Sequence, residues 1–377
     1  MCFVALSTFN FLQLVSASLV AATLWVKHMQ HFRFSIFISL ICLAVASYWG
    51  YSHGGLSAAA SALGIALILA TLEISLSFDN AVVNASVLKN WNAFWQTLFL
   101  TVGIIIAVFG MRLVFPLVIV AVAADLGIGE VWNLALDNPK EFSTHLIRHH
   151  AEVAAFGGVF LLLVFLNFLF DDEKDTHWLG NVEAKIATFG RIGSIPVLIA
   201  LGVVVSSVSL VESTQQYAVL LSGVWGIIVY VGVDFISSLL EKEESTDVDV
   251  GAMVKSGGIG GFLYLEVLDA SFSFDGVIGA FAITSDVVII MLGLAIGALF
   301  VRSMTVYLVR QGTLEEYVFP EHGAHYAIGI LSLIMFASIK FHIPEIFTGL
   351  IGVAFIIASL WSSIQHKKNA ASPHSLN

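Results

Sequence analysis

The stretch that decides the fold is residues 72–82, LEISLSFDNAV, because it occurs a second time as LDASFSFDGVI at residues 268–278. Superposing the two copies places Glu73 on Asp269 and Asp79 on Asp275. In both copies the two acids are separated by the same interval, and both copies lie in long apolar runs. Matching polar interruptions in two halves of an apolar chain indicate an internal repeat.

Four carboxylates in apolar segments require an explanation, since a charged side chain at the centre of a bilayer costs about 2.5–3.5 kcal/mol on insertion scales. Two interpretations remain open. The acids are structural groups that hold helices together, or they form a cation site or a proton relay. Either way, each needs a partner or a water-filled cavity.

The spacing of the acids bears on this choice. Positions six residues apart on an unbroken helix differ by about 600°, which leaves them about 120° apart around the axis. Both acids of a pair face one ion only if the helix is interrupted. Ser, Asp and Asn compete for backbone hydrogen bonds, and Gly tolerates unusual backbone angles. We therefore expect irregular helices near Ser77–Asp79 and Ser273–Asp275, with the four acids gathered near the membrane midplane.

The composition is that of a polytopic membrane protein. The chain has 377 residues, of which 58% are hydrophobic and 11% charged, and its mean hydropathy is +0.93. Two cysteines give no disulfide framework, and a net charge of -11 argues against a nucleic-acid partner. The chain has no phosphate-binding or dinucleotide motif and no embedded Ser/His pair, so we expect no enzymatic activity.

Runs long enough to cross a bilayer core of roughly 30 Å predict about ten transmembrane helices. They fall at approximately 34–50, 58–83, 96–122, 153–170, 192–211, 217–239, 257–283, 286–309, 325–340 and 344–364. We divide the chain into a dispensable N-terminal apolar extension (1–28), a first repeat half (29–211), a second repeat half (212–364) and a cytoplasmic tail (365–377).

The two halves are expected to run in opposite senses. The motifs lie on the second and the seventh predicted helix, an odd number of helices apart, so the second copy is inverted relative to the first. Loops on one side hold most of the Lys and Arg residues, and only Lys140, Arg148 and Lys340 fall on the other. The positive-inside rule places the first side in the cytoplasm. The predicted fold is all-α, with two inverted five-helix repeats.

The candidate metal ligands are Glu73, Asp79, Asp269 and Asp275. Further candidates are Glu266, Asn80, Ser77 and Ser273. An all-oxygen set suits Mg²⁺, Mn²⁺ or Ca²⁺ better than Zn²⁺ or Cu⁺. Three more intramembrane charges, Arg112, Arg302 and Asp234, are candidate charge partners. Each arginine either pairs with a motif carboxylate or extends to a lipid headgroup, and Asp234 either faces the cavity or caps its helix.

The doubled motif and the arginines that follow it resemble the TerC family of integral membrane proteins, within the LysE-type transporter superfamily. The ten predicted helices, and Glu266 just before the second motif, resemble those of the DUF475-like branch of this family. The resemblance covers roughly residues 60–340, and it implies export of divalent cations, chiefly Mn²⁺, from the bacterial cytoplasm. Two positions depart from the family pattern: Asp269 replaces a longer acid, and Gly276 stands where the first copy has Asn80.

The leading expectation is a secondary exporter of a hard divalent cation in the bacterial cytoplasmic membrane, with the lipid bilayer as its surroundings and no permanently bound cofactor. Two alternatives stay open. The same acids relay protons or bind a partner in a protein that transports nothing, or they bind the ammonium group of an exported organic cation or amino acid. An amino-acid exporter needs a larger pocket with aromatic walls.

Overall fold

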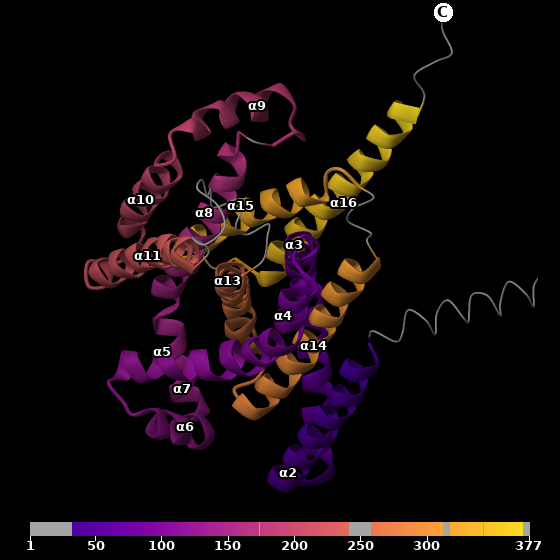
Figure 1. Ribbon diagram of the computed structural model, residues 1–377. Coiled ribbons are helices and arrows are strands. Elements are labelled where there is room, and N and C mark those ends of the chain that lie inside the picture. Colours follow the sequence, from indigo (N-terminus) through magenta and orange to yellow (C-terminus); the bar gives the residue numbers. More distant parts are fainter. Residues whose placement is uncertain (1–31, 173, 241–257, 312–316, 342, 372–377) are drawn as a thin grey trace, which may run out of the picture.

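The computed structural model describes residues 32–172, 174–240, 258–311, 317–341 and 343–371 (Figure 1). This part of the chain is helical and contains no strand. In chain order its elements are α2 (Arg33–Leu76), α3 (Phe78–Leu88), α4 (Ala93–Ile105), η1 (Ile106–Val114), α5 (Phe115–Ala124), α6 (Ile128–Asp137), α7 (Pro139–Arg148), α8 (His150–Phe170), α9 (Asn181–Ala187), η2 (Thr188–Arg191), α10 (Ile195–Ser207), η3 (Val208–Leu210), α11 (Gln216–Leu240), α13 (Ile259–Ile283), α14 (Val287–Gln311), α15 (Pro320–Ser338) and α16 (Glu345–Ala371).

Helix α2 is a helical hairpin. Its backbone leaves the helical region at Gly54 and Gly55, and Gly55 has a φ of 71°, which glycine adopts without steric cost. A β-carbon on Gly50 would lie 2.8 Å from the β-carbon of Ala62, so the segment before the turn packs closely on the segment after it. The 44 residues of α2 therefore make two antiparallel helical segments, 33–53 and 56–76.

Six helical segments in the described residues are long and apolar enough to cross a membrane. They are Arg33–Leu76, Ala93–Val122, His150–Phe170, Gln216–Val233, Val287–Gln311 and Phe347–Lys368. The number becomes seven if the bent pair Asn181–Gly190 and Ile195–Leu210 is one span. This is the helical character of a multi-pass membrane protein, while the expected ten spans and the inverted repeat stay predictions.

Two of the expected boundaries can be compared with the structure. The N-terminal extension, residues 1–28, lies outside the described residues. Helix α16 continues to Ala371, so the described part of the expected tail, 365–371, is a helical extension of the last predicted span.

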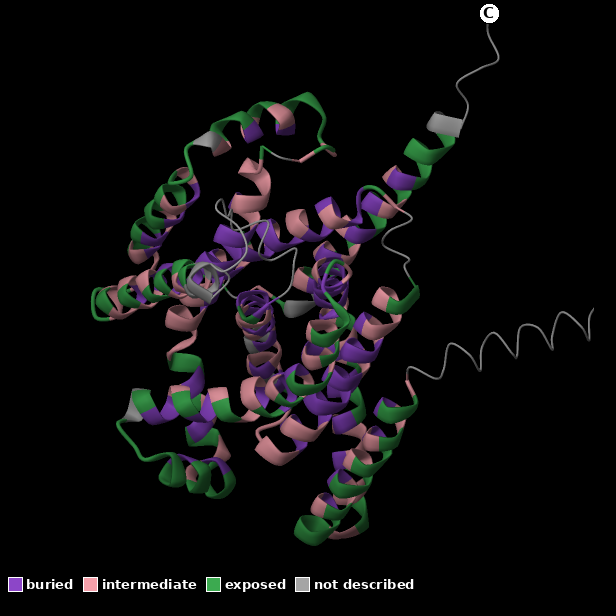
Figure 2. Ribbon diagram, viewed as in Figure 1, coloured by how far each residue is buried: buried purple, intermediate pink, exposed green. Residues whose placement is uncertain are grey.

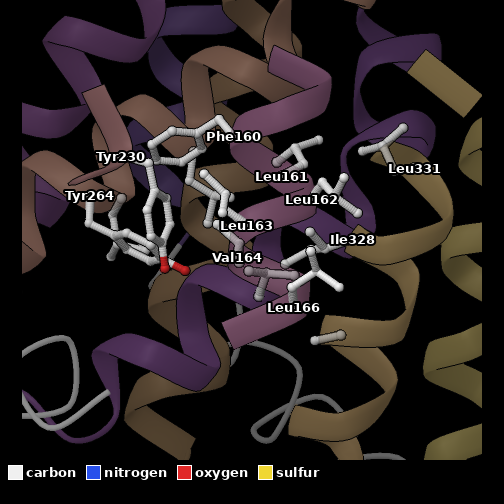
Figure 3. Packing of buried hydrophobic residues seen from close by; sticks show 14 of the residues in the cluster. Phe160, Leu161, Leu162, Leu163, Val164, Leu166, Tyr230, Tyr264, Ile328 and Leu331 are labelled. Carbon is white, nitrogen blue, oxygen red and sulfur yellow. The ribbon is translucent and has the colours of Figure 1, made fainter. Parts of the chain in front are cut away.

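The largest apolar core surrounds α8, which is polar only near its ends. Figure 3 shows Phe160 to Leu166 of α8 between Tyr230 and Tyr264 on one side and Ile328 and Leu331 on the other. These partners belong to α11, α13 and α15, so α8 joins elements that are distant in sequence.

Helix α14 packs along α2, and both carry small residues at the contact. Gly297 lies directly against the side chain of Glu73 and the carbonyl oxygen of Ala70, where a β-carbon would collide. Figure 2 shows the buried residues of α3, α13 and α14 at the centre, whereas α10 and α11 carry exposed faces. The exposed residues include Leu198 and Trp225, and such apolar faces suit contact with lipid.

Candidate functional site

The first motif contains the predicted helix break. Helix α2 ends at Leu76 and α3 begins at Phe78, with Ser77 between them at φ −98° and ψ 17°. The expectation of an irregular backbone near Ser77–Asp79 is confirmed. The break places Glu73 on one helix and Asp79 in the first turn of the next, and both side chains are buried.

Glu73 is held by an ion pair with Arg112 that is almost inaccessible to solvent. Arg112 Nη2 donates to Glu73 Oε1, and the Ser77 hydroxyl donates to the same oxygen at 3.0 Å. The interpretation that an arginine pairs with a motif carboxylate is thus confirmed for Arg112. The pair compensates a carboxylate that would otherwise be costly in the protein interior.

Arg112 reaches Glu73 from a π-helical segment, η1. Its Nη1 donates to the carbonyl oxygen of Ala107 at 2.6 Å, so one guanidinium joins the backbone of its own helix to the motif acid. π-Helical turns are rare and occur often at functional sites. Sequence reasoning found the arginine but did not find the π-helix.

A small cavity lies beside Glu73 and Asp79. Its volume is about 40 Å³, and its lining combines both motifs: Glu73, Leu76, Ser77 and Asp79 of the first, Phe272 and Gly276 of the second, and Leu331, Thr348 and Gly349. A β-carbon on Gly276 would lie 2.9 Å from Glu73 Oε2, so the missing side chain leaves the carboxylate its space. A cavity of this volume holds one water molecule or one ion of similar size.

The second motif does not break its helix, so this part of the prediction is wrong. Helix α13 runs without interruption from Ile259 to Ile283, through Ser273 and Gly276. A single Gly in a helix interior costs only about 1 kcal/mol, and packing on α3, α8 and η1 holds this segment helical. The side chains of Asp275 and Asp234 lie outside the described part of the structure.

Asn80 connects the two motifs. Its side-chain amide donates to Asp269 Oδ1 at 2.5 Å, and Asn84, one turn later, donates to the same oxygen at 3.4 Å. The backbone N–H of Asn80 donates to Asp79 Oδ1 at 2.9 Å. One residue therefore holds an acid of each motif, and the difference between Asn80 and Gly276 gives the two copies different roles.

Among the described residues no carboxylate pairs with Arg302. It is buried, and its guanidinium lies 4.0 Å above the ring centroid of Phe99, a cation–π contact. The side chain of Glu266, also buried, has no hydrogen-bond partner in the described structure for either carboxylate oxygen. The hydroxyl of Ser273 likewise has none there.

No three His, Cys, Asp or Glu side chains among the described residues are arranged so that they could hold a metal ion. Glu73 and Asp79 border the motif cavity, whereas Glu266 is not in its lining. Asp269 accepts hydrogen bonds from the two asparagines of α3. The convergence of four acids on one ion thus stays a prediction. Where α7 meets α8, His149 pairs with Glu152 at 2.7 Å.

Comparison with protein-family models matches residues 78–370 to a model described as "Protein of unknown function (DUF475)". This chain belongs to the DUF475 family. The matched range includes Asp79, both arginines and the whole second motif, and it begins after Glu73. No curated protein and no solved structure matches the DUF475 chain. The wider likeness to TerC and the LysE-type transporters stays a prediction.

Proposed function

We propose that this DUF475 protein is a secondary exporter of a hard divalent cation, with Mn²⁺ the favoured substrate, in the bacterial cytoplasmic membrane. The observation that carries the proposal is the cavity of about 40 Å³ between the two motifs. Glu73, Asp79 and Ser77 offer it carboxylate and hydroxyl oxygens, the donors that such cations prefer. Asp269 and Asp275 are the second half's proposed ligands.

The Glu73–Arg112 pair supplies a way to bind and release the cation. A guanidinium compensates the carboxylate when the cation is elsewhere, and a divalent cation beside Glu73 replaces that compensation and repels Arg112. The two positive partners thus compete for one carboxylate. Such competition keeps the acid compensated in both states, which a transporter requires of a charged group in an apolar interior.

Packing between the halves supports the inverted repeat. Helix α2, with the first motif, packs on α14, and η1, with the first arginine, packs on α13. Helix α3 packs on α15 as α13 packs on α8, and α8 and α15 pack on each other. A twofold axis in the membrane plane generates such reciprocal pairs, and in repeat transporters the substrate lies at the repeat interface.

The cavity volume separates the proposal from one alternative. Sites for organic molecules usually enclose about 300–1,000 Å³, and the motif cavity is far smaller. A second cavity, of about 260 Å³, lies at the end of α8 with Phe168, Tyr230 and Tyr264 in its lining beside Asp172 and Glu321. Because aromatic walls and acids suit an organic cation, basic amino acids belong in the transport assay.

The test is efflux from liposomes that contain the purified full chain, measured for Mn, Mg, Ca, Zn and Fe and for lysine and arginine. We expect Mn²⁺ efflux, and we expect Asp79→Asn and Asp275→Asn to abolish it, since an amide offers one oxygen and no charge. Asp137→Asn, on the exposed face of α6, is the matched control. Wild-type rates in both motif variants would make these acids structural, and efflux of lysine alone would favour the organic-cation alternative.

A further inference from the structure

The cavity of about 260 Å³ at the end of α8, here called the tyrosine cavity, lies on the same helices as the motif cavity. Helices α3, α13 and α15 line both cavities, with Ser86, Tyr264 and His325 in the tyrosine cavity and Asp79, Phe272 and Leu331 in the motif cavity. These intervals along three helices, at about 1.5 Å per residue, separate the cavities by about 10 Å. Because α3 packs on both α13 and α15, the two cavities follow one another along a single path.

Two asparagines occupy the layer between the cavities. Asn80 and Asn84 of α3 come between Asp79 and Ser86 in the chain, and both are buried. Their side-chain amides donate to Asp269, while their carbonyl oxygens have no hydrogen-bond partner among the described residues. A buried acceptor without a partner costs free energy. This layer therefore offers oxygen atoms that a cation can use in place of water.

The lining of the tyrosine cavity presents hydrogen-bond acceptors. Asn167 donates through Nδ2 to the carbonyl oxygen of Leu163 and to the hydroxyl of Tyr230, both at 2.9 Å, which leaves its own carbonyl oxygen to the cavity. Tyr264 is buried, and no hydrogen bond joins its hydroxyl to a described residue. In Figure 3 the hydroxyls of Tyr230 and Tyr264 point the same way. The cavity thus fits a ligand that donates hydrogen bonds.

The charge of the lining favours a cation. The charged residues that line the cavity are three acids and one lysine: Asp171, Asp172, Glu321 and Lys174. Two ion pairs, Lys174 with Glu183 at 3.0 Å and Glu321 with Lys89 at 3.4 Å, compensate one charge of each sign. The lining keeps an excess of acid, and a concave surface with one sign of charge concentrates ions of the opposite sign.

Both faces of the Phe168 ring are occupied, which disfavours an organic ammonium ion. His325 stacks on this ring with the centroids 4.0 Å apart, and Lys174 Nζ lies 4.1 Å from the same centroid. A ring stacked so closely leaves no room for the lysine on its own side, so the two groups cover opposite faces. An ammonium ion that enters the cavity therefore finds neither face of Phe168 open for a cation–π contact.

The volumes of the two cavities suit different forms of one cation. A hard divalent cation in octahedral coordination carries about six waters, and at about 30 Å³ each these waters fill about 180 Å³. The tyrosine cavity, at about 260 Å³, has room for this hydrated ion, whereas the motif cavity, at about 40 Å³, does not. No three His, Cys, Asp or Glu side chains among the described residues are placed to hold a metal directly. Contact in the tyrosine cavity would therefore run through the water shell.

We propose that the tyrosine cavity binds the divalent cation together with its water shell, before the cation moves to the motif cavity. The coordinated waters donate to Asn167, Tyr264 and the acids of the lining. The shell is lost on the way past Asn84 and Asn80, and the carboxylates of the motif cavity replace it. The inference rests on the proposed export of a divalent cation, and the positive-inside rule puts this end of the path in the cytoplasm.

The first measurement uses hexaamminecobalt(III), an inert complex that resembles a hydrated cation and donates N–H where the hydrated ion donates O–H. Its binding to the purified full chain in detergent is followed by calorimetry. We expect binding to the wild type, and binding about tenfold weaker in Tyr264→Phe and in Asp172→Asn, because each loses an acceptor for a charged ligand. The matched controls are Tyr217→Phe and Asp137→Asn, at exposed sites on α11 and α6. If Tyr264→Phe does not fold, Asp172→Asn, at an exposed position, still decides.

The second measurement is Mn²⁺ uptake by inside-out membrane vesicles, whose outer surface is the cytoplasmic face. We expect the cobalt complex to inhibit uptake competitively and to stay outside, because it cannot lose its ligands. The inhibition constant should rise about tenfold in Asp172→Asn, again for the loss of an acceptor.

Three results would overturn the inference while leaving the exporter in place. They are Mn²⁺ uptake that the complex does not inhibit, binding of the complex that neither cavity variant weakens, and binding that Asp79→Asn alone abolishes. Displacement of the complex by arginine and not by Mn²⁺ would also overturn it and assign the cavity to an organic cation. Binding that the cavity variants weaken, in a protein that takes up no divalent cation, would refute the proposed function and leave the tyrosine cavity as a site for hydrated cations.

Discussion

The buried pair of Glu73 and Arg112 can be tested by removing one partner and then both. In Arg112→Gln, Glu73 keeps its charge and its place against Gly297 but loses its cationic partner, and the carbonyl oxygen of Ala107 loses a donor. Breaking a buried pair from one side costs about 3–5 kcal/mol, because an uncompensated charge stays buried. We expect this loss of free energy of unfolding in Arg112→Gln.

The double variant Glu73→Gln with Arg112→Gln removes both charges and leaves two amides that can bond to each other. We expect it to be more stable than the sum of the single effects predicts, with a coupling energy of about 1–3 kcal/mol. Arg112→Lys should give an intermediate loss, since an ammonium keeps the charge but cannot reach Glu73 and Ala107 with the same planar fork.

The assay is reversible unfolding in mixed micelles of increasing SDS content, followed by circular dichroism. Arg148→Gln, at an exposed site on α7, is the matched control and should stay within about 0.5 kcal/mol of the wild type. Additive effects of the two single substitutions, or a loss in Arg112→Gln no larger than in the control, would refute the idea that the ion pair stabilises the motif.

Three further predictions concern the motif cavity, the ionised side chains around Glu183, and the access of solvent from the two sides of the membrane. Gly276→Ala should weaken Mn²⁺ binding about tenfold, within the 1–3 kcal/mol typical of overpacking, because the added β-carbon would lie 2.9 Å from Glu73 Oε2. Gly64→Ala is the control, since open space surrounds Gly64. Equal Mn²⁺ affinities of the two variants would contradict the assignment of the cavity as the cation site. Burial raises the pKa of the Glu183 carboxyl, but the Leu179 N–H, Lys174 at 3.0 Å and His322 outweigh burial and hold the pKa below its usual 4.5. The stability that this depressed pKa contributes is present above pH 4.5 and is lost as the pH falls below it. Glu183→Gln should therefore flatten the acid side of a curve of stability against pH, and an unchanged curve would contradict the stabilising role of Glu183. In a background without Cys2 and Cys42, Mn²⁺ should change the labelling of Ser52→Cys and Asn90→Cys by an impermeant thiol reagent in opposite directions, whereas parallel changes would argue against alternating access.

The sequence by itself determined the class of protein and the positions of the important charges. An apolar content of 58% predicts a membrane protein, and the described structure has the helical character of one. The doubled motif located acids that the structure does bury, including Glu73, Asp79 and Asp269. The backbone break at Ser77 was also predictable, since Ser and Asp side chains compete locally for backbone hydrogen bonds. These properties depend on composition and on neighbours along the chain.

Only the tertiary structure decided which charges meet. The same local signal broke the helix at Ser77 and left α13 continuous at Gly276, because a weak local preference yields where packing from other helices holds the backbone. Likewise, Arg112 and Arg302 occupy equivalent places in the two copies, yet one pairs with Glu73 and the other lies on Phe99. Spacing along a chain specifies which residues share a helix face, while contacts across 39 residues, as for Glu73 and Arg112, or across 189, as for Asn80 and Asp269, depend on how whole helices pack.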